Sequence, residues 1–285
     1  MSALVQPEWD MVTSVHEAAE MHAMARAVSG SAIYVSDKPG EHDFALLARV
    51  VLPDGSVLRA RGAARPTRDC LFSDVLRDGT SLLKAWNTNA YTGVVGVFHL
   101  QGSSWDRVKR KFITHDAAPA QLSTQVRPCD VEGLLPSEGL QLAAAYAFTS
   151  KTLRLLRADE ALTVSLSSTT GEVVAIAPVV EADGVRFAPL GLCEMYNGGG
   201  AVHACAAHPA GGLRVGRGSI DGVATTTTFD VAVRAGGRFL AYCSRAPASV
   251  KADGSSVAFT YDAATCALHV QVPLCAGLAQ LAVAV

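Results

Sequence analysis

The last two thirds of this sequence are made of short apolar segments that end at turn residues, and this texture limits the fold more than any other feature. From about residue 81, nine strand-like runs are separated by Gly, Asp, Asn or Pro. Short strands at spacings of roughly 8 to 20 residues are typical of an antiparallel β-sandwich. The runs are 81–87, 92–100, 161–168, 172–180, 184–190, 229–234, 238–244, 257–262 and 268–274. We therefore predict that residues 81–285 form a β-sandwich domain.

The N-terminal part of the chain has a different texture, in which helical and strand-like segments alternate. Ser14 followed three residues later by Glu17 is a capping-box pattern, which predicts a helix that runs to about Val28. Residues 32–36, with the sequence AIYVS, predict a short buried strand, and residues 42–51 predict a second helix. This alternation is typical of a parallel α/β sheet.

The change of texture predicts two domains, of which residues 1–80 form the α/β part. A complete (β/α)8 barrel needs about 250 residues. The α/β part supplies only one helix, one strand and another helix, so it cannot close a barrel by itself. We expect such an incomplete sheet to leave an unpaired strand edge and apolar helix faces exposed.

Composition excludes several classes of protein. The formal net charge is -2 and Lys and Arg are scattered, so we expect no nucleic-acid or anionic-membrane partner. The one basic run, RVKRKF at residues 107–112, predicts a solvated strand or turn. The longest apolar run, at residues 173–180, is far shorter than the roughly 20 residues of a membrane span. Seven cysteines without a Cys-x-x-Cys pair predict reduced thiols and a cytoplasmic protein.

Three other kinds of site are not supported by the motifs present. His203, Cys205 and His208 are ligand types at plausible spacing, but the second half of a zinc site is missing, so we predict no metal. The run NGGGAV at residues 197–202 is not followed by Gly-Lys-Ser/Thr and predicts a turn instead of a phosphate loop. The chain has no Gly-x-Ser-x-Gly elbow of a serine hydrolase.

Eight segments of the chain carry a resemblance to a known family. They follow one another in the order QPEWDM, YVSDKPG, VLPDGSVLRAR, RPTRDCLFSD, DGTSLLKAWN, TGVVGVFHLQG, FAPLGL and MYNGGGAV. They are similar to successive motifs of the raffinose synthase and seed imbibition protein family of plants, from about Gln6 to about Ser249. The resemblance implies an α-galactosidase-like (β/α)8 barrel followed by a C-terminal β-domain. This chain would hold only the C-terminal segments of the barrel, followed by the antiparallel β-sandwich.

The resemblance also implies a reaction. A complete member would transfer galactose from galactinol to sucrose, forming raffinose, by a retaining mechanism with two carboxylates and no cofactor. In the related enzymes both carboxylates lie on earlier barrel segments, so we expect the nucleophile and the acid/base upstream of this chain. The family shows Asp, Phe and Gly-Gly-Cys where Glu8, Val12 and residues 29–31 stand, which leaves the substrate open.

Two alternatives to galactosyl transfer remain open. The first is an alkaline α-galactosidase of the same family, in which water replaces the sucrose acceptor. The second is a non-catalytic truncated remnant, because no candidate nucleophile precedes the loop EWDM. Transfer and hydrolysis differ in residues that shape the acceptor pocket, and most of these would lie upstream.

Five residues are candidates for the sugar site by the same resemblance. Trp9, Asp10 and Met11 match a substrate-contacting loop of α-galactosidases, where Asp10 could accept hydrogen bonds from galactose hydroxyls and Trp9 could form an apolar wall. Asp37 and Lys38 follow the expected strand and would face the same mouth. Without the resemblance, these positions are typical of packing and turn residues. Asp37 could also be the acid/base itself, an assignment that we rank below a site-lining role.

Overall fold

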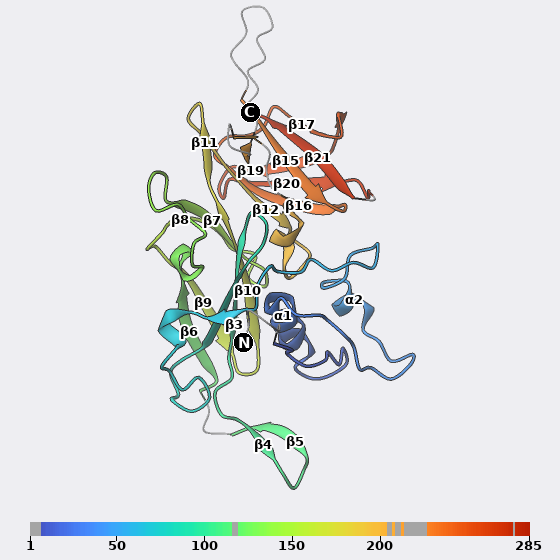
Figure 1. The fold of residues 1–285 in the computed structure, drawn as a ribbon, viewed down its shortest axis with the longest axis vertical. Coiled ribbons are helices and arrows are strands. Elements are labelled where there is room, and N and C mark those ends of the chain that lie inside the picture. Colours follow the sequence, from blue (N-terminus) through green and yellow to red (C-terminus); the bar gives the residue numbers. More distant parts are fainter. Residues whose placement is uncertain (1–6, 116–118, 204–206, 209–211, 214–226, 276) are drawn as a thin grey trace, which may run out of the picture.

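The structure is a computed structural model that describes residues 7–115, 119–203, 207–208, 212–213, 227–275 and 277–285. Figure 1 shows an elongated body in which β-sheets are stacked along the long axis and the two α-helices lie to one side. Every pairing between the named strands is antiparallel. None of the helices in the described part of the chain is long and apolar enough to cross a membrane.

The lower half of the body is built on a six-stranded sheet with the order β1-β2-β3-β10-β7-β8. Its strands are β1 (Arg65–Pro66), β2 (Leu83–Thr88), β3 (Gly93–Phe98), β7 (Leu142–Ala147), β8 (Leu153–Arg157) and β10 (Gly171–Pro178). The pair β6 (Gln121–Val126) and β9 (Leu162–Ser167) packs on one face. Because side chains alternate along a strand, Val95 and Val97 of β3 and Val174 and Ile176 of β10 share this core.

A second sandwich forms the upper half. A five-stranded sheet, β11-β12-β16-β20-β19, packs against a four-stranded sheet, β15-β21-β17-β18. Phe187 and Phe229 stack between the two sheets with ring centroids 4.9 Å apart. The strands are β11 (Val180–Ala182), β12 (Val185–Leu192), β15 (Thr228–Arg234), β16 (Gly237–Cys243), β17 (Ser249–Ala252), β18 (Ser255–Ser256), β19 (Phe259–Asp262), β20 (Ala267–Val272) and β21 (Leu278–Ala284).

The remaining elements are short. The β4–β5 hairpin projects from the lower end of the body in Figure 1, and β13 pairs with β14 in a separate two-stranded sheet. Three 3₁₀ turns connect strands in the described part of the chain. Their bounds are β4 (Ser103–Asp106), β5 (Lys111–Thr114), β13 (Ala207–His208), β14 (Gly212–Leu213), η1 (Arg68–Cys70), η2 (Pro128–Asp130) and η3 (Gly198–Ala201).

The β-rich expectation is confirmed strand by strand. The nine runs become β2, β3, β9, β10, β12, β15, β16, β19 and β20. The basic run 107–112 forms the turn and the start of the second strand of the β4–β5 hairpin, as expected. Strand β7 was not anticipated, because LAAAYA is rich in alanine, a helix former, and its strand conformation comes from packing between β8 and β10.

The N-terminal helix begins later than the capping-box pattern predicts, and that prediction is wrong. Helix α1 spans Ala19–Ser29, and its N-cap residue, Ala18, makes no side-chain capping bond. Ser14 instead directs its hydroxyl to the Asp37 carboxylate at 2.5 Å. The C-terminal end agrees with expectation, because Gly30 adopts the left-handed conformation at φ 76° that glycine tolerates best.

Two further N-terminal predictions need correction. Helix α2 spans only Phe44–Leu47, where residues 42–51 were expected to be helical. Residues 32–36 form no buried strand but one isolated parallel bridge between Val12 and Val35, and the Val35 side chain is 41% exposed. Since no further parallel strand lies beside it in the described residues, this segment stays at the surface. The described part of the chain therefore does not establish a barrel.

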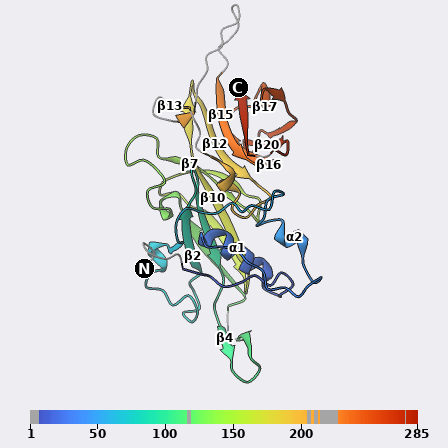
Figure 2. The ribbon, with the colours of Figure 1, turned by 45° about the vertical axis from the view of Figure 1, so that its right-hand side comes forward.

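Helix α1 lies against the six-stranded sheet, and Figure 2 shows the same contact after rotation, with α2 farther from the sheet. Met24 and Val28 of α1 pack with Val94, Phe98 and Val173 on the face opposite β6 and β9. The N-terminal segment thus shares a hydrophobic core with the β-strands, and burial of this core fixes its position.

Candidate functional site

The loop Trp9–Met11, the first part of the predicted sugar site, lies at the surface beside α1. Trp9 is half-buried, Asp10 is exposed and Met11 is 41% exposed. Asp10 has a positive φ of 69°, a conformation that is uncommon for residues other than glycine. Its Oδ1 atom accepts a hydrogen bond of 2.8 Å from the Met11 backbone N–H. The local bond leaves the other carboxylate oxygen of Asp10 at the surface, where it could accept a ligand hydroxyl.

Arg26 of α1 fixes this loop. Its Nε atom donates to the Asp10 carbonyl at 3.0 Å, and its two terminal nitrogens donate to the carbonyls of Met11 at 3.2 Å and His22 at 3.3 Å. Arg26 therefore acts as a positioning residue for the loop. Sequence reasoning missed it because an arginine in the last helical turn is ordinarily explained by the helix dipole.

Acidic groups surround this arginine. Tyr34 donates from its hydroxyl to Glu8 Oε1 at 2.5 Å, and this hydrogen bond is the main cause of a raised pKa of Tyr34. Burial lowers the pKa of Arg26, while the charges of Asp10 and Glu8 oppose the shift. The cluster thus combines one clamped cation with two carboxylates and an aromatic hydroxyl. Carboxylates beside aromatic surfaces are groups that can bind sugar hydroxyls.

Asp37, the second part of the predicted site, has a structural role, because it joins its own segment to Ser14 by hydrogen bonds. Its side chain is inaccessible to solvent and accepts bonds from the Ser14 N–H at 2.6 Å and the Ser14 hydroxyl at 2.5 Å. His42 Nδ1 lies 3.1 Å from the same carboxylate. These bonds, with the Ser14 hydroxyl as the largest cause, lower the pKa of Asp37. A buried carboxylate with a low pKa is poorly suited to donate a proton near neutral pH.

Lys38, the residue after Asp37, lies at the surface. Its Nζ atom is 3.9 Å from Glu41 Oε2, and both side chains are largely exposed. Because Val12 pairs with Val35, Asp10 precedes the parallel bridge and Asp37 follows it. Asp10 and Asp37 therefore lie about four residues apart along the strand direction, at a rise of roughly 3.3 Å per residue. No hydrogen bond or ion pair between described residues joins the Trp9–Met11 loop to Asp37 or Lys38.

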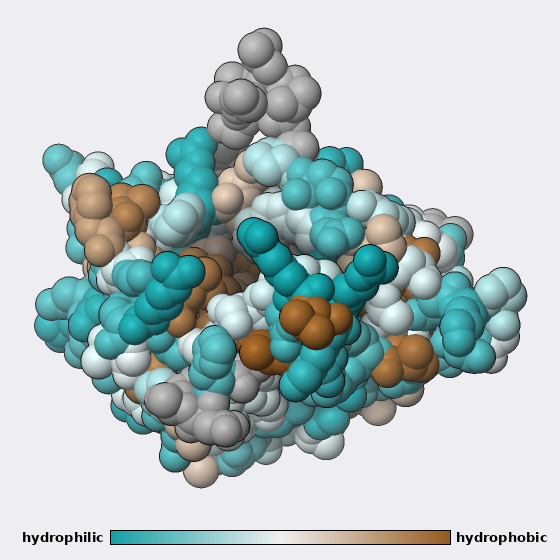
Figure 3. Space-filling view, turned by 90° about the horizontal axis from the view of Figure 1, so that it is seen from below, coloured by the Kyte–Doolittle hydropathy of each residue, from teal (hydrophilic) through white to brown (hydrophobic). Residues whose placement is uncertain are grey.

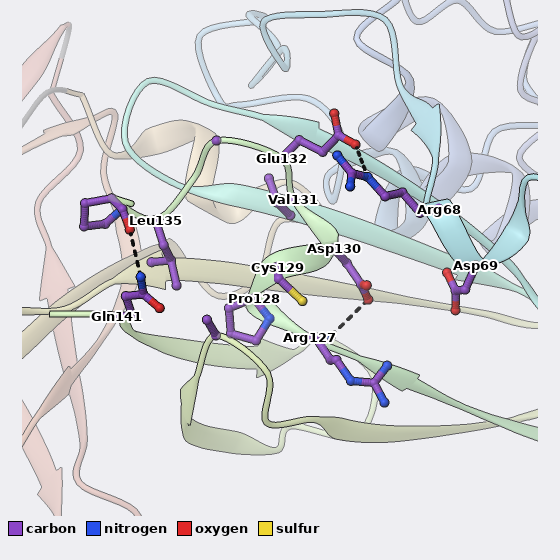
Figure 4. Close-up of a pocket in the computed structure, with 13 residues that line it drawn as sticks. Arg68, Asp69, Arg127, Pro128, Cys129, Asp130, Val131, Glu132, Leu135 and Gln141 are labelled. Atoms are coloured by element: carbon purple, nitrogen blue, oxygen red, sulfur yellow. Dashed lines mark hydrogen bonds and ion pairs between the residues drawn. The ribbon is translucent and has the colours of Figure 1, made fainter. Parts of the chain in front are cut away.

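A hollow of about 520 Å³ with both charged and apolar lining residues lies beside η1 and η2, and Figure 4 shows its lining. Arg68 of η1 donates from Nε to Glu132 Oε1 at 2.8 Å across the hollow. Behind it, the fully buried Lys84 places Nζ 2.8 Å from Asp69 Oδ2 and 3.0 Å from Asp130 Oδ2. This ion network joins η1 to η2. Sequence reasoning did not find it, because Lys84 lies within an otherwise strand-like run.

The run from His203 to His208, at which no metal is predicted, is only partly described, since Cys205 and the side chain of His208 lie outside the described residues. The run NGGGAV forms η3 and its flanks, in agreement with the predicted turn.

His22, which faces the same cluster, should make the loop sensitive to pH. Burial, followed by the charges of Arg26 and His16, lowers the pKa of His22 to about 4. Between this value and the ordinary value of 6.5, the unfolded chain binds more protons than the folded chain. Stability therefore rises with pH across this window and is lost on acidification. We expect melting temperatures measured from pH 4.5 to 7 to rise more steeply for the unmodified chain than for His22→Gln.

The control for this experiment is His115→Gln, which changes a solvent-exposed histidine. Its pH profile should match that of the unmodified chain. Superimposable profiles for the unmodified chain and His22→Gln would contradict the assigned role of His22.

Comparison with known proteins adds a finding that geometry alone does not supply. A family model described as raffinose synthase or seed imbibition protein Sip1 matches residues 1–272. A probable galactinol–sucrose galactosyltransferase 6 of Arabidopsis thaliana is 41% identical over 271 residues, which are 93% of this chain and 34% of the relative. A galactinol–sucrose galactosyltransferase of Oryza sativa is 40% identical over 92% of this chain and 32% of its own length.

A stachyose synthase of Pisum sativum is 35% identical, with 92% of this chain and 29% of the relative covered. The chain thus spans about one third of the length of these curated relatives. The part that it matches lies in their C-terminal region.

Proposed function

This chain belongs to the raffinose synthase or seed imbibition protein family, and from that premise we propose that it provides the C-terminal third of a galactosyl-transferring enzyme. The single observation that carries this proposal is the match over more than nine tenths of the chain to galactinol–sucrose galactosyltransferases. In this proposal residues 1–80 complete a (β/α)8 barrel and residues 81–285 form the β-domain. The setting is cytoplasmic.

The Trp9–Met11 loop would line the galactose site of the assembled enzyme. Asp10 would accept hydrogen bonds from galactose hydroxyls, Trp9 would cover an apolar face of the sugar, and Arg26 would hold the loop in place. The arrangement is supported by the exposed Asp10 carboxylate and by the bonds from Arg26 to the carbonyls of Asp10 and Met11. Asp37 would keep the neighbouring segment in register through Ser14, and Lys38 would lie at the rim.

The reaction would follow the retaining route, in which one carboxylate attacks the anomeric carbon and a second protonates the departing oxygen. The second carboxylate then takes a proton from the acceptor hydroxyl, which attacks the galactosyl-enzyme bond and regenerates both groups. Both carboxylates would come from the part of the enzyme that corresponds to the N-terminal two thirds of the relatives. Galactinol would be the donor and sucrose the acceptor.

The test is a chimaera in which residues 7–285 replace the matching third of the Oryza sativa relative. We expect it to form a trisaccharide from galactinol and sucrose. Asp10→Asn should lower kcat/KM for galactinol by roughly 10- to 100-fold, because a hydrogen bond to a charged acceptor is lost. The matched control, Asp159→Asn, changes an exposed carboxylate in the turn between β8 and β9 and should leave kcat/KM unchanged.

Three results would count against the proposal in different ways. Release of free galactose without any sucrose-dependent product would favour the α-galactosidase alternative. A folded chimaera that performs neither reaction would favour the non-catalytic alternative. Equal activity of Asp10→Asn and the unmodified chimaera would remove Asp10 from the site.

A further inference from the structure

We propose that the β4–β5 hairpin binds the surface of an anionic lipid bilayer. The inference goes beyond the galactosyl reaction, because none of the hairpin residues belongs to the candidate sugar site. The formal net charge of -2 for the whole chain argues against such a partner. The fold, however, places the one basic run at the end of a projecting element, where its charge acts locally.

The hairpin stands apart from the sheets of the body. In the described part of the chain, β4 and β5 form a two-stranded sheet of their own. Figure 1 shows this hairpin below the six-stranded sheet, at one end of the long axis. A tip in this position can reach a flat surface before the rest of the molecule does.

The hairpin carries a local excess of positive charge. Four exposed cationic side chains lie in and beside its turn, namely Arg107, Lys109, Arg110 and Lys111. The one carboxylate of residues 103–114 is that of Asp106. Among the described residues, none of the four cations forms an ion pair. Their charges are therefore available to an anionic surface, where each Lys or Arg strengthens binding by about fivefold.

An apolar side chain lies at the tip of the same hairpin. Asp106 Oδ1 accepts hydrogen bonds from the N–H groups of Val108 at 2.9 Å and Lys109 at 3.0 Å, which fixes the turn. The Val108 side chain is 93% exposed, and that of Trp105 on β4 is 51% exposed. Figure 3 shows this end of the molecule, where separate apolar side chains stand among hydrophilic ones. The tip thus presents apolar surface together with cations.

This combination favours a lipid surface over other polyanions. The anionic headgroups of a bilayer lie directly above an apolar layer, so Val108 can enter that layer while the flexible Lys and Arg side chains keep their charges at the headgroups. Tryptophan is enriched at the same interface. A nucleic acid or an acidic peptide offers negative charge but no continuous apolar layer for Val108.

The experiment measures co-sedimentation of the full chain with lipid vesicles in the absence of any sugar. We expect binding to vesicles of equal parts phosphatidylcholine and phosphatidylserine, and little binding to pure phosphatidylcholine. Raising the salt concentration from about 0.1 M to about 1 M should release the protein, because the screening length falls from about 10 Å to about 3 Å. Brominated acyl chains should quench the fluorescence of Trp105, and Trp105→Phe should lose this quenching.

A double variant tests the role of charge. Arg107→Gln combined with Lys109→Gln should weaken vesicle binding about 25-fold, at about fivefold for each lost cation. The matched control is Arg154→Gln combined with Lys251→Gln, which removes the same charge from exposed positions on β8 and β17. Because distant charges are screened, the control should change binding by less than about twofold.

A single variant tests the role of the apolar tip. Val108→Ser should weaken vesicle binding by about tenfold, because the burial of about two carbon groups is lost. Its control is Val15→Ser, at a valine that is 59% exposed in the N-terminal segment, and it should leave binding unchanged. All variants should retain the far-ultraviolet circular dichroism of the unmodified chain.

Three outcomes would overturn the proposal. The first is an absence of binding to phosphatidylserine vesicles at low salt. The second is equal weakening by the hairpin double variant and its control, since total charge would then govern binding. The third is binding of single-stranded RNA or polyglutamate that Val108→Ser does not weaken, which would assign the hairpin to another polyanion. Because no sugar is present, each of these results leaves the proposed galactosyl transfer untouched.

Discussion

Lys84→Met should lower the free energy of unfolding by about 3–5 kcal/mol, because it removes the cation from a buried ion network. The Lys84 side chain is fully buried and its Nζ atom contacts Asp69, Asp130 and the Gln125 carbonyl at 2.8, 3.0 and 2.7 Å. Methionine fills a similar volume but leaves the Asp130 carboxylate, which is 12% exposed, without its partner. Urea unfolding followed by circular dichroism measures the difference.

A control variant and a rescue variant separate the effect of the lost charge on stability from the effect of altered packing. Lys109→Met removes an exposed lysine on the β4–β5 turn and should change stability by less than about 0.5 kcal/mol. Adding Asp130→Asn to Lys84→Met should recover part of the loss, because an amide costs less to bury than an unpaired carboxylate. A Lys84→Met chain as stable as the Lys109→Met control would show that the network contributes nothing.

Gly198→Ala should destabilise the chain by about 3 kcal/mol or more, because two backbone segments meet at this residue. A Cβ atom at Gly198 would lie 2.1 Å from the Leu192 carbonyl oxygen, which cannot move without disturbing β12. Gly191, which lies beside Leu192 on β12, also comes close to the Gly198 backbone. It has a φ of +97°. The same unfolding measurement applies, and the variant should also expose the junction between η3 and β12 to faster hydrogen exchange.

Gly62→Ala is the matched control for this close approach. A Cβ atom there would meet Asn87 Oδ1 at 3.5 Å, an ordinary contact distance. We expect a change of less than about 1 kcal/mol at Gly62. Similar losses at the two glycines would show that the close contact with the Leu192 carbonyl oxygen does not explain the loss at Gly198.

The strands of the β-rich part could be predicted because their signal is local. Apolar residues alternate or cluster over six to eight positions in β10, β12 and β16, and turn residues separate the runs. The position of β7 could not be predicted in this way. Its alanines favour a helix locally, but pairing with β8 and β10 stabilises the strand conformation instead.

The contacts that position the candidate site could not be predicted from the sequence. The loop Trp9–Met11 lies at the surface, and its role in sugar binding stays a prediction. The hydrogen bonds that position these segments join residues far apart in the chain, such as Arg26 with Asp10 and Asp37 with Ser14. Sequence spacing carries no signal for such contacts, so neither Arg26 nor the buried state of Asp37 was foreseen.

The sequence by itself determined the β-rich character of residues 81–285, the end of α1 at Gly30 and membership of the family, because each depends on short patterns or on motif order. Only the tertiary structure decided where α1 begins, that Val12 pairs with Val35 and that Lys84 contacts Asp69. A hydroxyl such as that of Ser14 can cap a helix or bind a distant carboxylate, and burial of the whole core selects between the two.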